Sequence, residues 1–186
     1  EHSLEQLESV SNWKKYSESF VIRPDNKYIV YVRVEDKTGN VNYFNTDGLV
    51  FDSTPPTING VRNRGISYTT QKVEGEDNFA LSSFKVDGSN STGTIEGNPS
   101  VETKHTLVAY DVAGNSATIT ITMMPISALG ENLPKEEEMT LADMQSIQET
   151  LKKVQTILEK ECKHATTQEK QALEDLEKRC QELLKK

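Results

Sequence analysis

Glycine and proline are distributed so unevenly along this chain that it must combine two kinds of structure. All 10 glycines and all 6 prolines lie before residue 139. Residues 139–186 are dominated by Glu, Lys, Gln and Leu, which favour helices, whereas residues 20–123 are rich in Thr, Val, Ile, Tyr and Phe, which favour strands. The sequence therefore predicts a mainly β protein with a separate α segment at its C-terminal end.

The C-terminal segment has the apolar spacing of two amphipathic helices. Two sets of apolar residues recur every three or four positions, namely Met144, Ile147, Leu151, Val154 and Leu158, then Leu173, Leu176, Cys180 and Leu183. Thr140 with Asp143, and Thr166 with Glu169, have the spacing of N-terminal caps. Because the break between the stripes is short, we expect an antiparallel helical hairpin over 139–186.

The cysteines and histidines do not form a recognisable site. Cys180 lies about 14 residues beyond the predicted turn that follows Cys162, which is roughly 20 Å along a helix axis. A disulfide requires Cα atoms within about 7 Å, so both cysteines are expected to serve as small apolar core residues. The histidines at positions 2, 105 and 164 lie in different segments and do not suggest a metal site.

An Asp-x-x-Gly-Asn pattern occurs twice in the β-rich region, each time between strand-like segments. Its members are Asp36, Gly39 and Asn40 in "VEDKTGN", and Asp111, Gly114 and Asn115 in "AYDVAGN". Glycine supplies the positive φ that a short connection needs, Asn tolerates similar geometry, and Asp accepts hydrogen bonds from nearby backbone amides. The pattern predicts structural turns that join strands over 27–36 and 41–52, and over 106–112 and 116–123.

The alternative interpretation of these loops is calcium binding or carboxylate catalysis. Calcium takes about six to eight oxygen ligands, and each loop offers a single well-placed Asp. The stretch "EGED" at 74–77 could add ligands, although a solvated turn is the simpler interpretation. No nucleophile elbow, phosphate-binding loop or His-Glu-x-x-His motif is present. We therefore predict no catalytic residues, no metal and no cofactor, and expect a protein that is not an enzyme.

The string "YVRVEDKTGNVNYFNTDGLVFDSTPPTI", followed by a unit that ends in "LVAYDVAGNSATITIT", resembles the immunoglobulin-like repeats of large bacterial surface proteins, especially those of Gram-positive gut bacteria. The resemblance covers about 20–123 and implies small immunoglobulin-like β-sandwich units in tandem. It implies a partial or trimmed unit over 1–52 and a sandwich over 53–123. Two prolines, a glycine and an acidic run predict a linker over 124–138, before the helical hairpin at 139–186.

The charge of the chain limits its partners. A net charge of −8 and a pI near 5.0 disfavour nucleic acid and anionic lipid, because both repel an acidic protein. No apolar run approaches the roughly 18–20 residues that a membrane span requires, so direct membrane insertion is not expected. The first residues, "EHSLEQLESV", lack the basic and apolar regions of a signal peptide, which suggests a mature or excised fragment.

The resemblance implies a secreted or bacterial cell-surface location, with attachment to the cell wall through regions outside this fragment. The leading hypothesis is a non-enzymatic binding or adhesion module that recognises a host or extracellular protein, with immunoglobulin as a candidate, through exposed helix or sheet faces. The candidate contacts are polar residues of the first C-terminal helix: Gln145, Gln148, Lys152, Gln155 and Glu159. The alternative is a spacer between neighbouring domains of a multidomain surface protein such as a glycoside hydrolase.

The apolar residues of the predicted strands and those of the predicted helices lie in separate parts of the chain. We therefore expect separate cores, so that Leu151→Asp should unfold the helices and leave the sandwich folded.

Overall fold

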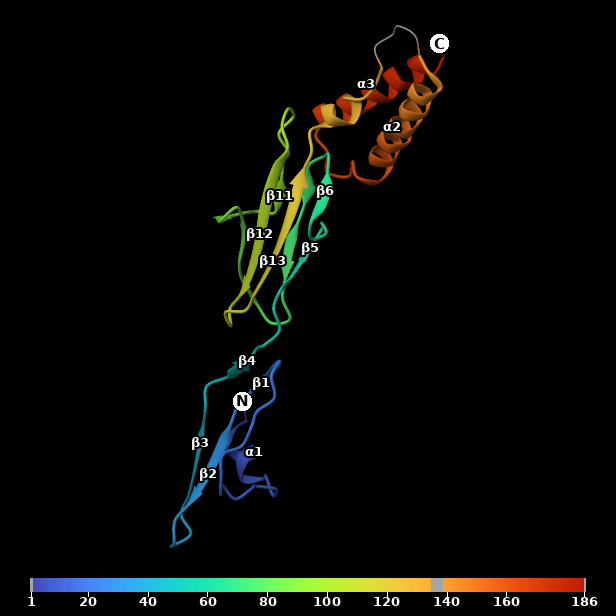
Figure 1. Cartoon of the computed structure of the whole chain (residues 1–186). Helices are drawn as coiled ribbons and strands as arrows, with labels where there is room; N and C mark the ends of the chain where they lie inside the picture. The colour runs from blue at the N-terminus through green and yellow to red at the C-terminus, as the bar shows by residue number, and fades with distance from the viewer. Residues whose placement is uncertain (1, 135–138, 186) are drawn as a thin grey trace. The chain divides into compact units, whose positions relative to one another are not determined.

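The computed structural model describes residues 2–134 and 139–185, and its internal contacts divide the chain into two units, Glu1–Thr54 and Pro55–Lys186 (Figure 1). Several small sheets are followed by two C-terminal helices. This arrangement confirms the predicted division into a β-rich region and a helical region.

The first unit consists of one short helix and two antiparallel strand pairs. Its elements are α1 (Leu4–Glu8), β1 (Asn26–Tyr28), β2 (Tyr31–Glu35), β3 (Val41–Asn45) and β4 (Leu49–Phe51), with β1 paired to β4 and β2 to β3. The predicted continuous strands over 27–36 and 41–52 are wrong in this respect, because both are interrupted. Between β1 and β2, the Val30 amide donates to the Thr46 hydroxyl at 3.1 Å, while the Val30 carbonyl accepts from the Thr46 amide at 3.0 Å.

The first unit has almost no buried core. Leu7 is its one buried apolar side chain among the residues described. On the ribbon of β2 and β3, Val32 lies opposite Phe44, and both are about half exposed, as is Val34. Because a two-stranded ribbon is marginally stable by itself, this unit depends on local contacts such as the packing of the Trp13 ring near Tyr43.

The second unit is built on a five-stranded sheet in the order β10-β9-β12-β13-β6, with the strand pairs β5-β8 and β11-β7 beside it. The strands are β5 (Thr57–Asn59), β6 (Gly65–Ser67), β7 (Gln71–Lys72), β8 (Glu74–Glu76), β9 (Leu81–Val86), β10 (Ser89–Asn90), β11 (Thr94–Ile95), β12 (Thr103–Asp111) and β13 (Ser116–Met123). All pairings are antiparallel except that of β13 with β6.

The core of the β region lies between the large sheet and the short pairs. Leu107 and Ile121 point inward from β12 and β13, where alternate residues are buried as expected for a sheet with one covered face. Val73 and Ile95, from the region of the short pairs, pack against them. At one end of this sheet, β13 continues into η1, and Tyr68, which follows β6, packs against the helical region.

The helical region comprises η1 (Ile126–Gly130), α2 (Leu141–Lys160) and α3 (Thr167–Leu183). Thr140 and Thr166 each form a complete capping box, so both predicted caps are confirmed. Near the turn, Ile157 of α2 packs in one cluster with Leu173 of α3, and farther away Ile147 packs with Cys180. The order of these contacts shows that the two helices run in opposite directions.

The segment predicted as a linker packs against the helices where it is described. Leu129 and Leu133 are buried in the two helical clusters. Residues 135–138 of the predicted linker lie outside the described residues. Cys162 and Cys180 are free thiols packed in these clusters, and burial raises the pKa of both, which agrees with their predicted apolar role.

Candidate functional site

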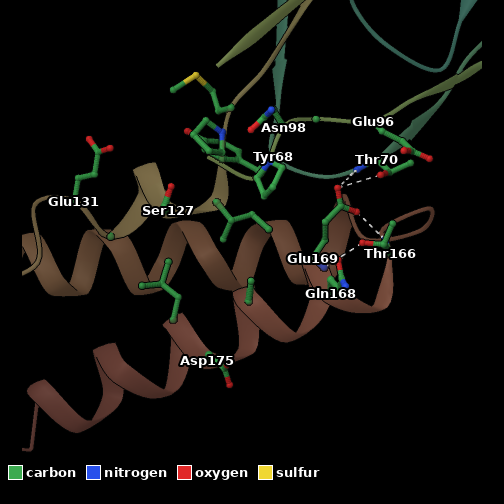
Figure 2. A pocket seen from close by; sticks show the side chains of 18 of the residues that line it. Tyr68, Thr70, Glu96, Asn98, Ser127, Glu131, Thr166, Gln168, Glu169 and Asp175 are labelled. Carbon is green, nitrogen blue, oxygen red and sulfur yellow. Dashed lines mark hydrogen bonds between the residues drawn. The ribbon is translucent and has the colours of Figure 1, made fainter. Parts of the chain in front are cut away.

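A cleft of about 650 Å³ opens in the second unit where one end of the sheet meets α3 (Figure 2). Its walls come from four separate parts of the chain: the connection between β6 and β7, the segment after β11, the segment from Met124 to Glu131, and the part of α3 up to Arg179 with its cap residue Thr166. Because these parts are distant in sequence, the cleft exists only when the helices are packed on the sheet.

Glu169 joins the two walls of the cleft. One oxygen of its carboxylate accepts hydrogen bonds from the backbone amide of Thr70 at 2.9 Å and from the Thr70 hydroxyl at 3.0 Å. The other oxygen accepts from the Thr166 amide at 2.7 Å, as part of the capping box of α3 (Figure 2). Nearby, the Thr69 hydroxyl donates to the Glu161 carbonyl at 3.0 Å. The cleft is therefore preformed.

We expect Glu169→Ala to lower the free energy of unfolding of the second unit by about 2–3 kcal/mol, because it removes the acceptor of the Thr166 amide in the capping box and leaves the buried Thr70 amide without an acceptor. Urea unfolding followed by circular dichroism measures the change. Glu174→Ala is the matched control, since Glu174 is exposed on the same helix, and its effect should stay within about 0.5 kcal/mol. Equal effects of the two variants would contradict the structural role of Glu169.

The cleft combines an apolar floor with an acidic rim. The floor includes Tyr68, Ile126 and Leu176, all partly buried. The charged residues around it are four acids and one base: Glu96, Glu131, Glu169, Asp175 and Arg179. Within the described part of the chain, Asp175 accepts a hydrogen bond from Gln171, whereas Glu96 and Glu131 make neither a hydrogen bond nor an ion pair. These rim carboxylates are available to a ligand.

The predicted contact residues of α2 lie elsewhere. Gln145, Gln148, Lys152, Gln155 and Glu159 are all exposed along α2, and none of them lines the cleft. Lys152 borders a smaller depression of about 310 Å³ beside Tyr68. The Gln155 amide donates to Glu177 of α3 at 2.9 Å, so this residue also joins the two helices. Their role as a binding face stays a prediction.

The two Asp-x-x-Gly-Asn loops share two hydrogen bonds, from the backbone amide and the side chain of the Asn to the carboxylate of the Asp. The Asp36 carboxylate accepts from the Thr38 and Asn40 amides at 2.8 and 2.9 Å, and from the Asn40 side chain at 2.8 Å. The Asp111 carboxylate accepts from the Gly114 and Asn115 amides at 2.6 and 2.8 Å, and from the Asn115 side chain at 2.8 Å. Each carboxylate thus organises its own turn, and the two loops belong to different units.

These turns predict a loss of stability in acid. Hydrogen bonds from Asn40 and Thr38 lower the pKa of Asp36. Burial acts to raise the pKa of Asp111, but hydrogen bonds from Asn115 and Gly114 outweigh the effect of burial, so the pKa of Asp111 is lowered as well. A group with a lowered folded-state pKa stabilises the protein fully above its unfolded-state pKa, about 3.9 for Asp, and this stabilisation is lost as pH falls through the folded-state pKa.

We therefore expect the urea midpoint to fall as the pH is lowered below about 4, and the fall to be shallower in Asp111→Asn, because that variant removes one such titrating group. Glu96→Gln, which changes an exposed acid without hydrogen bonds in the described residues, should keep the wild-type slope. An unchanged slope in Asp111→Asn would show that its hydrogen bonds do not favour the charged form.

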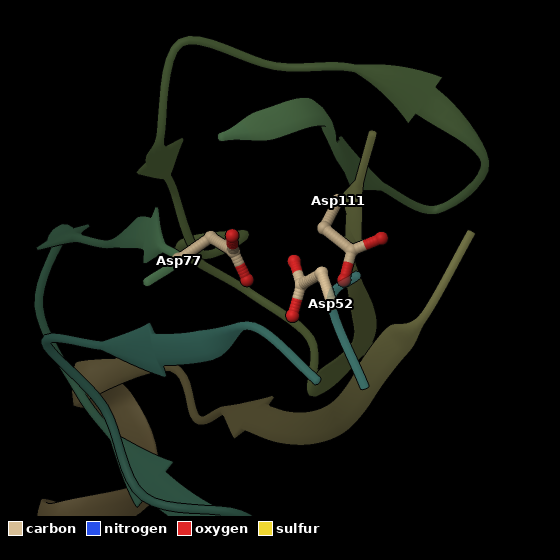
Figure 3. Close-up of side chains that lie close together, drawn as sticks. All are labelled: Asp52, Asp77 and Asp111. Atoms are coloured by element: carbon tan, nitrogen blue, oxygen red, sulfur yellow. The ribbon is translucent and has the colours of Figure 1, made fainter. Parts of the chain in front are cut away.

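Asp77 lies beside Asp111 in the second unit, and their carboxylate oxygens are within 4.8 Å of each other (Figure 3). One Asp77 oxygen accepts from the Phe79 and Ala80 amides at 2.8 and 2.9 Å, while Oδ1 is buried without a partner in the described structure. Asp52, drawn in the same view, belongs to the first unit. Two carboxylates supply too few ligands for calcium, and the Asp111 oxygens already serve the turn.

A hydrogen-bonded chain of Asp87, His105 and Thr103 is a feature that the sequence analysis missed. His105 Nδ1 lies 2.7 Å from Asp87, and its Nε2 lies 3.1 Å from the Thr103 hydroxyl. The order of the groups matches an acid, a base and a nucleophile, but the chain lines neither of the cavities described above. Asp87 also accepts from the Thr106 amide at 2.8 Å, so these bonds fasten the turn after β9 to β12.

Comparison with known proteins does not identify the chain. No family model matches it, and no match is found among curated protein sequences. In the described residues, no helix has both the length and the apolar character needed to cross a membrane.

Proposed function

We propose that this chain is a non-enzymatic binding module of a larger, secreted or surface-attached bacterial protein. In this proposal, tandem immunoglobulin-like β units carry a C-terminal antiparallel helical hairpin, and the module recognises a host or extracellular protein, for which immunoglobulin is one candidate. The observation that supports binding is the preformed cleft between the sheet end and α3, whose apolar floor is open to solvent.

The chemistry of the cleft favours recognition over catalysis. Its best-ordered carboxylate, Glu169, accepts three hydrogen bonds from Thr70 and Thr166, and so acts as a structural acceptor rather than as a free base. The remaining acids stand at the exposed rim, where they can attract a partner by charge. A rigid concave surface binds with a smaller loss of conformational entropy than a mobile one, which favours a recognition role.

Capture of proteins from serum or mucosal fluid tests the proposal. The intact chain should recover one dominant protein, and Ala172→Trp should abolish recovery, because Ala172 lines the cleft and a large ring there would fill it. Ala142→Trp is the control, since Ala142 is exposed on α2 away from the cleft. Recovery of no partner at micromolar concentration would overturn the binding role and favour the alternative, a spacer within a multidomain surface protein.

A further inference from the structure

We propose that the cleft beside α3 binds an extended peptide segment that carries alternating basic and apolar side chains. This inference rests on the proposed binding function and specifies the class of ligand. The first argument is charge: the lining has four carboxylates and one guanidinium, so it favours a cationic ligand. Glu131 and Asp175 both line the cleft and are exposed to solvent.

The floor of the cleft supplies the second argument. Ile126, Leu176 and the ring of Tyr68 form an apolar surface below the charged rim. Burial of an apolar side chain of the ligand against this surface would favour binding, so apolar residues become part of the recognition. A volume of about 650 Å³ lies within the usual range for a ligand cleft and accommodates a few side chains.

Two side-chain amides at the cleft have hydrogen-bonding groups without partners in the described residues. The Gln168 side chain faces the cleft, makes no hydrogen bond within the described residues and can both donate and accept. Asn98 uses its Oδ1 to accept from the Ser100 and Val101 amides, which leaves its NH₂ group for a ligand. Such groups suit the backbone of an extended peptide, whose amides and carbonyls need partners when they are bound.

An acidic ligand is disfavoured by the same features. The net charge of the chain is −8, and Arg179 is the one basic residue of the cleft lining. A phosphate or a peptide rich in Glu would face uncompensated carboxylates, and like-charge contacts reduce affinity and the rate of association. The intact chain should therefore distinguish peptides by the sign of their charge.

Fluorescence anisotropy with the intact chain tests this inference. The probe is a labelled synthetic peptide of alternating leucine and lysine, and its comparison peptide has glutamate in place of lysine. We expect saturable binding of the lysine peptide that weakens with added salt, and at least about tenfold weaker binding of the glutamate peptide. Equal binding of both peptides, or no saturable binding of the lysine peptide up to millimolar concentration, would overturn the inference.

Isosteric variants locate the site. The double variant Glu131→Gln and Asp175→Asn should weaken binding of the lysine peptide about tenfold, whereas Glu174→Gln with Glu182→Gln should not, although both pairs remove two acidic charges. Equal losses would show that overall charge, not the cleft, attracts the peptide. If Ala172→Trp abolishes capture of a serum protein but the lysine peptide fails to bind, the peptide inference is wrong and the proposed binding function stands.

Discussion

Replacement of Leu173 by alanine should lower the free energy of unfolding of the second unit by about 2–5 kcal/mol, the cost of truncating a fully buried leucine. Leu173 is 0% exposed and lies in the cluster that contains Val154 and Ile157 of α2. Leu129 of η1 belongs to the same cluster, and Tyr68 from the end of the sheet packs against it. The cavity left by the substitution would therefore weaken the attachment of the helices to the sheet.

Hydrogen exchange measured by NMR separates local from global effects of Leu173→Ala. We expect amide protection to fall in β12 as well as in α2, because the helices and the sheet belong to one unit. Leu141→Ala is the matched control, since Leu141 is 74% exposed on α2, and its effect should stay within about 0.5 kcal/mol. Loss of protection in α2 with wild-type protection in β12 would show that the helices unfold alone.

This expectation differs from the one that the sequence suggests. The apolar residues of the helices and of the strands lie in separate parts of the sequence, and this separation favoured two separate cores. Leu151→Asp was therefore expected to unfold the helices alone. The structure instead joins the two regions through polar contacts that no periodicity reveals, including those of Glu169 with Thr70 and of Thr69 with the Glu161 carbonyl. We now expect Leu151→Asp to reduce protection in β12 too.

Local features of the fold could be predicted from the sequence, because neighbouring residues determine them. The caps at Thr140 and Thr166 need a partner only three residues away, and both form as predicted. The interruption at Val30 was missed, because the acceptor of its amide is the side-chain hydroxyl of Thr46, just beyond the end of β3. The alternation of apolar and polar residues that predicts a strand does not indicate where a side chain takes the place of a backbone hydrogen-bond partner.

The cleft could not be predicted for a related reason. Glu169 and Thr70 are 99 positions apart, and the sequence around Glu169 indicates only its local role in the capping box. The segment after β13 was interpreted as a linker from its prolines and its acidic run, although Leu129 and Leu133 have helical spacing and are buried. Because residues from Met124 to Glu131 line the cleft, the interpretation of this segment as a linker left the cleft out of the prediction.

Replacement of Gly93 by alanine should destabilise the second unit by about 2–5 kcal/mol. Gly93 has a φ of +86°, a conformation that costs an L-residue about 1–2 kcal/mol. A Cβ atom at this position would also collide with the backbone carbonyl oxygen of Val73, and overpacking of this kind costs about 1–3 kcal/mol more. The Val73 amide donates to the Gly93 carbonyl at 2.8 Å, so the two backbones cannot separate without breaking a hydrogen bond.

Gly114→Ala isolates the steric part of this effect. Gly114 has a similar φ of +99°, but a Cβ atom there would meet nothing within 4 Å. Its substitution should therefore cost only the conformational term, about 1–2 kcal/mol. Urea unfolding of both variants at the same pH gives the difference, which we expect to exceed about 1 kcal/mol because Val73 is buried in the sheet core and cannot move aside. Equal effects would mean that the backbone of Val73 yields, and that this core is less tightly packed than the structure indicates.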